Sequence, residues 1–411
     1  MLAHLTDKRV ATWRGCLLGV EFFIERRVES RLSPAPARAV AAGDSVLVAA
    51  SWKRWADGAA IERWDTLALN AAEPNPFFES WYLLPALRRF DKAGKVEILR
   101  FERGGELVGL MPLERSWRYQ RWPLPHIRTW LHPNCFAAAP LVAKGCERAF
   151  WAAFLAWTDA NGGPALFAHL PELPIDGPLA AALRAESRAQ GRRLELVYRE
   201  ERALLDSDLA PADYLEQAVR GKKRKELRRQ HARLSEEGKL KLERFSDDRC
   251  LATWIDHFLA LEASGWKGAA GSALALHDAT TGLFRDALRG AGERGRLERL
   301  SLTLDGRPVA MLANFITPPG AYSYKTAFDE RFARFSPGVL LQLENLALLD
   351  HQTIAWCDSC AAPDHPMIDG LWTERRAIGR YSVAIGGAAK RSAFDRLVGA
   401  ELSRSPRGIA A

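Results

Sequence analysis

One short pattern, a turn glycine, a charged residue and then an apolar run, occurs once in each half of the chain. Residues Gly105–Met111 read Gly-Glu-Leu-Val-Gly-Leu-Met, and residues Gly306–Leu312 read Gly-Arg-Pro-Val-Ala-Met-Leu. An apolar strand-like run precedes each glycine, which places each glycine in the turn of a β-hairpin. Stretches with helical and strand periodicity alternate around both hairpins. The repetition predicts a duplicated α/β unit.

The expected fold is therefore α/β, with two tandem units that are each a mixed twisted sheet flanked by helices. Residues 33–43 are rich in Pro, Ala and Gly, which is typical of a linker. The expected segments are a poorly defined N-terminal extension at 1–69, a first unit at 70–205, a second unit at 206–385, and a C-terminal helix or tail at 386–411.

Composition excludes several classes of protein. The chain has 411 residues, of which 48% are hydrophobic and 26% are charged, an ordinary balance for a globular protein and not for a disordered or fibrous one. Six cysteines are too few for a disulfide scaffold of this length and favour a reducing compartment. No apolar run approaches the roughly 18 residues of a spanning helix. We expect a cytoplasmic protein, with peripheral contact to the inner membrane left open.

A strongly basic segment joins the two predicted units. Lys and Arg number 58 against 50 Asp and Glu, a net charge of +8. The linking helix expected at 219–237 is rich in Lys and Arg, while Leu227 and Leu234 form a narrow apolar seam. It is either a solvated helix held by that seam or a contact for phosphate groups of a nucleotide cofactor, a membrane headgroup or nucleic acid. Nucleic acid is disfavoured because no aromatic residue interleaves with the basic run. Peripheral contact of residues 220–233 with an anionic membrane is one of the interpretations that stay open, beside the solvated helix and the nucleotide.

A second candidate phosphate site follows the second hairpin. Residues 321–328 predict a strand, and a helix is expected to begin at Pro337 with Ser336 as its N-cap. The N-terminus of a helix placed just after a strand can bind a pyrophosphate, to which Arg334 adds a charge. Gly338 would let a ligand approach the backbone. The alternative is an ordinary capped helix without a ligand.

Five segments in this order resemble one protein family. They are Asn75–Phe78, the basic run Gly221–Arg229, Ser264–Gly268, Asp305–Ala310, and Tyr324–Glu330 with Ser336–Gly338. Together they resemble the GNAT-superfamily acyltransferases called BioF-like or CelD-like, which are related to the Fem aminoacyltransferases. The resemblance extends over residues 70 to 385. It implies two GNAT-like units, acyl-CoA as co-substrate, an amine as acceptor and no metal.

The resemblance also assigns the pyrophosphate of CoA to the loop and helix after the fourth strand. These are Arg334, Ser336, Gly338 and Val339 here. The chain departs from the usual pattern, since a single glycine remains and Pro337 removes an amide donor.

Acyl transfer to an amine needs a proton acceptor, a polarised carbonyl and a proton for the departing thiolate. Asp358 and His365 are candidates for acid–base roles, and Tyr324 for protonating the sulfur. Lys325, on the preceding strand, is a candidate for binding substrate or the acyl carbonyl. The alternatives are a turn or cap aspartate for Asp358 and a loop histidine for His365.

Three further features have competing interpretations. The loop 264–272 carries Trp266 and Lys267 among small residues, which favours a lid or acceptor-binding loop, or else a tryptophan packed on the body of the protein. Cys357 and Cys360 form a Cys-x-x-Cys pair, but zinc would need a second pair of ligands. The aromatic residues of 77–82 form either an apolar groove or core.

The resulting prediction is an acyl-CoA-dependent N-acyltransferase. Segments 358–368 and 371–376 are most similar to bacterial ceramide synthases, which favours a sphingoid base as acceptor. A sugar or polysaccharide precursor as acceptor, a Fem-like reaction with aminoacyl-tRNA, and a binding protein without activity are the alternatives.

Overall fold

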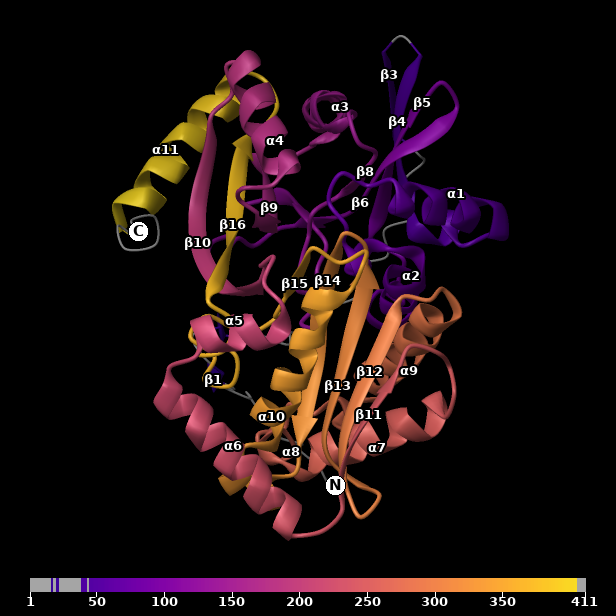
Figure 1. Ribbon diagram of the computed structural model, residues 1–411. Coiled ribbons are helices and arrows are strands. Elements are labelled where there is room, and N and C mark those ends of the chain that lie inside the picture. The colour runs from indigo at the N-terminus through magenta and orange to yellow at the C-terminus, as the bar shows by residue number, and fades with distance from the viewer. Residues whose placement is uncertain (1–15, 18–19, 22–37, 43, 405–411) are drawn as a thin grey trace, which may run out of the picture. The chain divides into compact units, whose positions relative to one another are not determined.

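The computed structural model describes residues 16–17, 20–21, 38–42 and 44–404 (Figure 1). The chain divides into two compact units, Met1–Ser33 and Pro34–Ala411. The described residues of the first unit form two short strands, β1 (Cys16–Leu17) and β2 (Val20–Glu21), which pair antiparallel.

The described part of the second unit contains one mixed sheet of fourteen strands, with helices on both of its faces (Figure 1). The strands are β3 (Arg38–Ala42), β4 (Ser45–Ser51), β5 (Glu97–Arg103), β6 (Glu106–Ser116), β7 (His126–Thr129), β8 (Leu141–Val142), β9 (Phe167–Pro174), β10 (Leu194–Leu205), β11 (Leu240–Phe245), β12 (Leu297–Leu304), β13 (Arg307–Thr317), β14 (Gly320–Phe328), β15 (Trp356–Asp358) and β16 (Glu374–Ala384). The α-helices are α1 (Gly58–Leu69), α2 (Ser80–Phe90), α3 (Glu147–Asn161), α4 (Pro178–Ala189), α5 (Pro211–Ala218), α6 (Gly221–Glu236), α7 (Leu251–Ser264), α8 (Trp266–Ala269), α9 (Asp278–Glu293), α10 (Pro337–Glu344) and α11 (Ala388–Arg404). Short 3₁₀ helices are η1 (Trp52–Trp55), η2 (Pro76–Phe78), η3 (Leu274–Leu276), η4 (Glu330–Phe335) and η5 (Asn345–Asp350).

The order of strands shows that the two halves repeat one arrangement. In the first half β4, β5, β6 and β7 pair antiparallel in turn, and β7 pairs parallel with β9. In the second half β11, β12, β13 and β14 pair antiparallel in turn, and β14 pairs parallel with β15. The sequence prediction of an α/β fold with two similar units and mixed twisted sheets is confirmed at this level.

The last strand of each half is exchanged. β10 follows β9 in the chain but pairs with β15, and β16 follows β15 but pairs with β9. The two exchanged strands also pair antiparallel with each other. The sheets of the two halves therefore join into one continuous sheet.

In the second half the sheet separates two cores, and helices cover each of them on its own face (Figure 1). The core on the face covered by α2, α7 and α9 contains many aromatic side chains, including Phe77, Phe315 and Tyr324. The core on the face covered by α5, α6 and α10 is mainly aliphatic, with Leu227 and Leu234 of α6 as buried members. The expected seam of the basic helix is thus buried.

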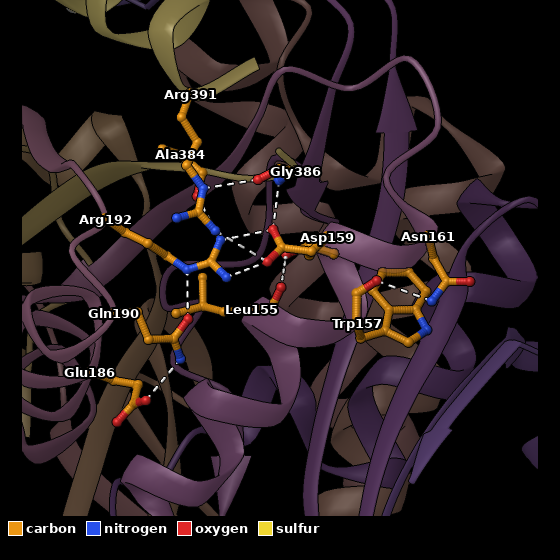
Figure 2. Close-up of polar contacts among 11 residues, drawn as sticks. Leu155, Trp157, Asp159, Asn161, Glu186, Gln190, Arg192, Ala384, Gly386 and Arg391 are labelled. Atoms are coloured by element: carbon orange, nitrogen blue, oxygen red, sulfur yellow. Dashed lines mark hydrogen bonds and ion pairs between the residues drawn. The ribbon is translucent and has the colours of Figure 1, made fainter. Parts of the chain in front are cut away.

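A cluster of ion pairs holds the C-terminal segment against the first half (Figure 2). Asp159 at the end of α3 accepts hydrogen bonds from Arg192, which is almost fully buried, and from the N–H of Gly386 at 2.6 Å. Arg391 of α11 lies 3.4 Å from the same carboxylate and donates to the Gly386 carbonyl at 2.9 Å. These contacts anchor the connection between β16 and α11.

Residues 44–69 differ from the expected loose extension. They form β4, η1 and α1, and β4 pairs with β5 along its whole length. Leu47 and Trp64 are fully buried, so this segment contributes to the cores of the first half. The linker-like residues 33–37 and 43 lie outside the described residues.

Candidate active site

Two parallel strands part at the centre of the second half. β14 and β15 pair only over Gly320–Tyr322 and Trp356–Asp358. β14 then continues to Phe328, and among the described residues no strand pairs with this edge beyond Tyr322. Backbone N–H and C=O groups of β14 are therefore available to a ligand at the split.

A β-bulge in β14 turns two neighbouring side chains to the same face. Lys325 pairs with Ala313 and Ser323 with Asn314, so Tyr324 is the extra residue. Ser323 hydroxyl contacts Gln342 of α10, whereas the Tyr324 ring stacks on Phe315 in the core on the α7 face. Lys325 lies on the α7 face as well, because the bulge interrupts the alternation of side chains.

The Lys325 ammonium lies among aromatic rings from both halves. Its Nζ is 5.0 Å from the centre of the Phe136 ring and 5.7 Å from that of Tyr324. No carboxylate of the described residues lies within ion-pair distance of this ammonium. Burial is the main cause that lowers the pKa of Lys325 to about 8, and the charge of the nearby Lys267 is the second. An ammonium in such a position can stabilise negative charge that develops on a bound substrate.

Tyr324 belongs to a buried chain of hydroxyl groups. Its Oη is 3.2 Å from Oη of Tyr82, which donates to the Asn134 carbonyl at 2.5 Å. Burial raises the pKa of Tyr324, so the phenol stays protonated at physiological pH. His132 stacks on Tyr82 and its Nδ1 accepts from the Asn134 N–H at 3.3 Å. Burial lowers the pKa of His132 to about 3, so this imidazole is neutral.

Asp358 is fully buried at the end of β15, between two arginines. Its carboxylate accepts a hydrogen bond from Nη2 of Arg202 of β10 at 2.8 Å and from Nη1 of Arg376 of β16 at 3.2 Å, and Nε of Arg202 lies 2.7 Å from Oδ1 as an ion pair. Oδ1 also accepts the N–H of Cys360, which has a left-handed backbone with φ of 53°. Burial opposes ionisation, but the two arginines hold the pKa of Asp358 below its usual range. These contacts hold the chain where it leaves β15.

Of the predicted acceptor-binding residues, Lys267 is near enough to Lys325 to lower its pKa. The expected flexible loop is instead a short helix, α8, whose N–H at Trp266 donates to Glu330 at 2.5 Å. Lys267 pairs with the buried Glu262 at 2.8 Å. His365 is half-buried. Its burial and, to a smaller extent, the charge of Lys267 lower the pKa of His365, so its imidazole is neutral near pH 7.

The predicted pyrophosphate loop has an unexpected internal geometry. Ser336 is the N-cap of α10, but it adopts a left-handed conformation with φ of 52° and its side chain forms no capping bond. The N–H groups of Val339 and Leu340 donate to the Ser336 carbonyl, at 2.9 and 3.0 Å. With Pro337 lacking an N–H, this turn retains few free donors for a phosphate.

Gly338 and Arg334 have protein neighbours at this loop. A Cβ added to Gly338 would lie 2.9 Å from Cε of Met367 and 3.2 Å from Cδ1 of Phe328. The glycine is thus explained by packing against the loop that follows β15. Arg334 is exposed and forms an ion pair with Glu237, just after α6, at 2.7 Å.

Helix α6 supplies further cations next to this loop. It contacts η4 and α10. Among the described residues, several exposed Lys and Arg side chains of α6 have no ion-pair partner, whereas Arg224 and Arg229 pair with Glu216 and Glu226. The unpaired residues are Lys222, Lys223, Lys225, Arg228 and Arg233.

The remaining sequence candidates are buried. Phe77, Phe78, Trp81 and Tyr82 belong to the core, as the alternative interpretation had it. Burial raises the pKa of both Cys357 and Cys360, so neither thiol is a thiolate near neutral pH. Sequence reasoning missed Phe136 and Arg202, because nothing in their surroundings along the chain indicates contact with β14 or β15.

The described residues contain neither a group of side chains suited to a metal ion nor a membrane-spanning helix. No three His, Cys, Asp or Glu side chains lie close enough together to hold a metal ion. No described helix combines the length and the hydropathy that crossing a bilayer would require.

Part of the second half matches a known kind of domain. Residues 221–365 match the family described as acetyltransferase (GNAT) domain. No curated protein matches the chain by sequence.

Solved structures resemble the chain over most of its length. FemX is 10% identical over 82% of this chain and 98% of its own, with a TM-score of 0.50. The C-terminal domain of a putative lysylphosphatidylglycerol synthetase from Agrobacterium fabrum is 15% identical over 81% and 94%, with a TM-score of 0.46. A tandem GNAT protein from the clavulanic acid biosynthesis pathway is 18% identical over 84% and 99%, with a TM-score of 0.39. Residues 221–365 are therefore similar to an acetyltransferase (GNAT) domain, and the α/β fold of the chain is similar to that of FemX.

Proposed function

We propose that the protein is an N-acyltransferase that uses an acyl-CoA, with its active site at the split between β14 and β15. The observation that carries this proposal is the bulge at Tyr324. It turns the Lys325 side chain to the α7 face of β14, beside the strand edge that β15 leaves unpaired. The matched GNAT domain supports acyl-CoA as the co-substrate.

The unpaired edge of β14 suits the pantetheine arm of CoA. This arm contains two amides in an extended chain, which can pair with a free strand edge as another strand would. The nucleotide end would then reach the start of α10, where free amide donors are few. The cations of α6 beside η4 can supply charge that this turn lacks.

The residues divide the chemistry between them. The amine attacks the thioester carbonyl, a C–N bond forms, and the C–S bond breaks as the thiolate leaves. Lys325 stabilises the negative charge on the carbonyl oxygen. His365, whose imidazole is neutral near pH 7, accepts the amine proton, and the departing thiolate takes up a proton from solvent. Asp358 acts as a positioning residue, since both of its oxygens already accept hydrogen bonds from Arg202, Arg376 or the Cys360 N–H.

We further propose a long-chain sphingoid base as the acceptor. Trp266 and Leu276 are 45% and 49% exposed, and they follow α7, the helix that packs on β14. Together they offer apolar surface for an alkyl chain near Lys325. The cations of α6 would suit an anionic bilayer from which such a lipid is drawn.

Thermal unfolding with a panel of CoA compounds tests the proposal. A ligand at 100 times its Kd stabilises a protein by about 2.7 kcal/mol, and we expect this shift with long-chain acyl-CoA. Free CoA serves as the control for the nucleotide alone.

The outcomes separate the acceptor classes. A shift that grows with acyl chain length, together with acylation of sphinganine, supports the full proposal. An equal shift with acetyl-CoA and acylation of an amino sugar would retain the transferase and reject the lipid acceptor. No shift with any CoA compound, combined with salt-sensitive binding of aminoacyl-tRNA, would overturn acyl-CoA as the donor.

A further inference from the structure

The connection between β6 and β7 exposes two tryptophans. Residues 116–124, here called the 116–124 loop, read Ser-Trp-Arg-Tyr-Gln-Arg-Trp-Pro-Leu. Trp117 is 67% exposed and Trp122 is 45% exposed. Neither indole N–H has a hydrogen-bond acceptor among the described residues. Two exposed indoles on one short connection are a costly arrangement for a surface that meets water alone.

Hydrogen bonds and ring contacts hold this loop in one conformation. Tyr119 and Trp122 exchange backbone hydrogen bonds of 3.0 and 2.9 Å across Gln120 and Arg121. The Tyr119 hydroxyl donates to Glu401 of α11 at 2.8 Å. The Tyr119 ring lies edge-on to Phe167, at 5.1 Å between ring centres. The two indoles are therefore presented on an anchored support.

The charge of the loop is positive. It contains Arg118 and Arg121 and no acidic residue. Arg121 lies over the Trp122 ring, 5.3 Å from its centre, and has no ion-pair partner among the described residues. Exposed indoles next to guanidinium groups match the two layers of a bilayer surface, since indoles favour the interface and guanidinium groups pair with lipid phosphates.

We propose that the 116–124 loop docks on the surface of an anionic lipid bilayer, with Trp117 and Trp122 inserted at the headgroup level. A single-stranded nucleic acid fits the loop less well, because Arg121 already covers one face of Trp122 that a base would need for stacking. The loop also supplies what α6 lacks. α6 carries cations, but its two leucines are buried, so it can attract a bilayer without inserting into it.

Binding of the full chain to lipid vesicles tests this proposal. The vesicles are phosphatidylcholine alone or a mixture with phosphatidylglycerol, and binding is measured by co-sedimentation. We expect binding to the anionic vesicles and a loss of about tenfold or more in affinity for Trp117→Ser/Trp122→Ser. Arg121→Gln should lose roughly fivefold, the equivalent of one basic residue near an anionic surface.

Matched variants keep the result specific. Leu69→Ser removes a side chain that is 71% exposed on α1 and should bind vesicles like the wild type. Since the changed side chains are exposed, the thermal midpoint of all loop variants should be unchanged, which excludes misfolding as the cause.

Three outcomes would overturn the proposal. The first is no binding to anionic vesicles, and the second is wild-type binding by the double Trp variant. The third is tight binding of single-stranded RNA that the double Trp variant loses while its vesicle binding persists. None of these readouts depends on acyl transfer, so the proposed activity can fail without deciding this result.

Discussion

Lys325 combines a positive charge with surroundings that penalise it. Two aromatic rings face the ammonium, and no carboxylate of the described chain pairs with it. Burial, with Lys267 adding to it, lowers the pKa of Lys325 to about 8. Below that pH the group is charged and can stabilise an oxyanion, and above it the charge is lost.

Substitution of Lys325 tests this role. We expect Lys325→Met to lower kcat by roughly 10²-fold, because an oxyanion stabiliser is removed, and to leave acyl-CoA affinity nearly unchanged. In the wild type, kcat/KM should fall as pH rises above about 8, since the lysine loses its proton. Lys325→Arg should keep part of the activity and lose this fall, because a guanidinium stays protonated.

Two results would contradict this role of Lys325. If Lys325→Arg keeps the same fall near pH 8, another group titrates there. If Lys325→Met retains full kcat, Lys325 takes no part in the reaction.

The sequence could indicate Asp358 and Lys325 as candidates but not their partners. Asp358 is separated in the chain from Arg202 by the whole of the second half up to β15, and only the exchange of strands brings them together. Similarly, Phe136 lies in the first half, and no local pattern places it against Lys325. Long-range contacts of this kind depend on topology, which single-residue patterns do not contain.

The elements themselves were largely predictable. Both hairpins and the helix start at Pro337 agree with β5–β6, β12–β13 and α10. These segments have clear periodicity and turn residues. The bulge at Tyr324 left no such signal, because one added residue in an apolar strand does not change its composition. The short helix α8 was missed because its Gly and Ala residues are typical of loops.

The element α10 offers a test of why Gly338 is a glycine. In Gly338→Ala the new Cβ meets the flexible end of Met367, so we expect a change in unfolding free energy within about 1 kcal/mol. Affinity for acyl-CoA should stay within about twofold, because the methyl group points at protein. Thermal unfolding with and without ligand measures both quantities.

A second variant separates packing from ligand contact at α10. Gly338→Ala/Met367→Ala removes the neighbour and should recover any stability lost by the single variant. A loss of tenfold or more in acyl-CoA affinity at unchanged stability would instead show that Gly338 borders the ligand.

At the scale of the molecule, neither half completes its own sheet. β15 depends on β10, and β9 depends on β16, for one of their neighbours. The boundary between residues 205 and 206 therefore separates the two repeats along the chain, but it does not separate two complete sheets. We expect it not to yield two stable pieces.

Expression of the halves tests this dependence. Residues 206–404 alone should aggregate or unfold without a cooperative transition, because the edges of β15 and β16 lose β10. Co-expression with residues 1–205 should yield a soluble complex, detected by size-exclusion chromatography and thermal unfolding. A soluble, cooperatively folding 206–404 fragment would show that the exchanged strands add little.

The place of β16 in the sheet also sets an order of events during synthesis. β9 and β10 leave the ribosome well before β16, the strand that finally separates them. Until then both present open edges in a chain that already contains most of its apolar residues, a state in which nascent chains stick to one another. Slow translation of the last strand would prolong that exposure, so yield in the cell should depend on chaperones that shield strand edges more than on the stability of the finished protein.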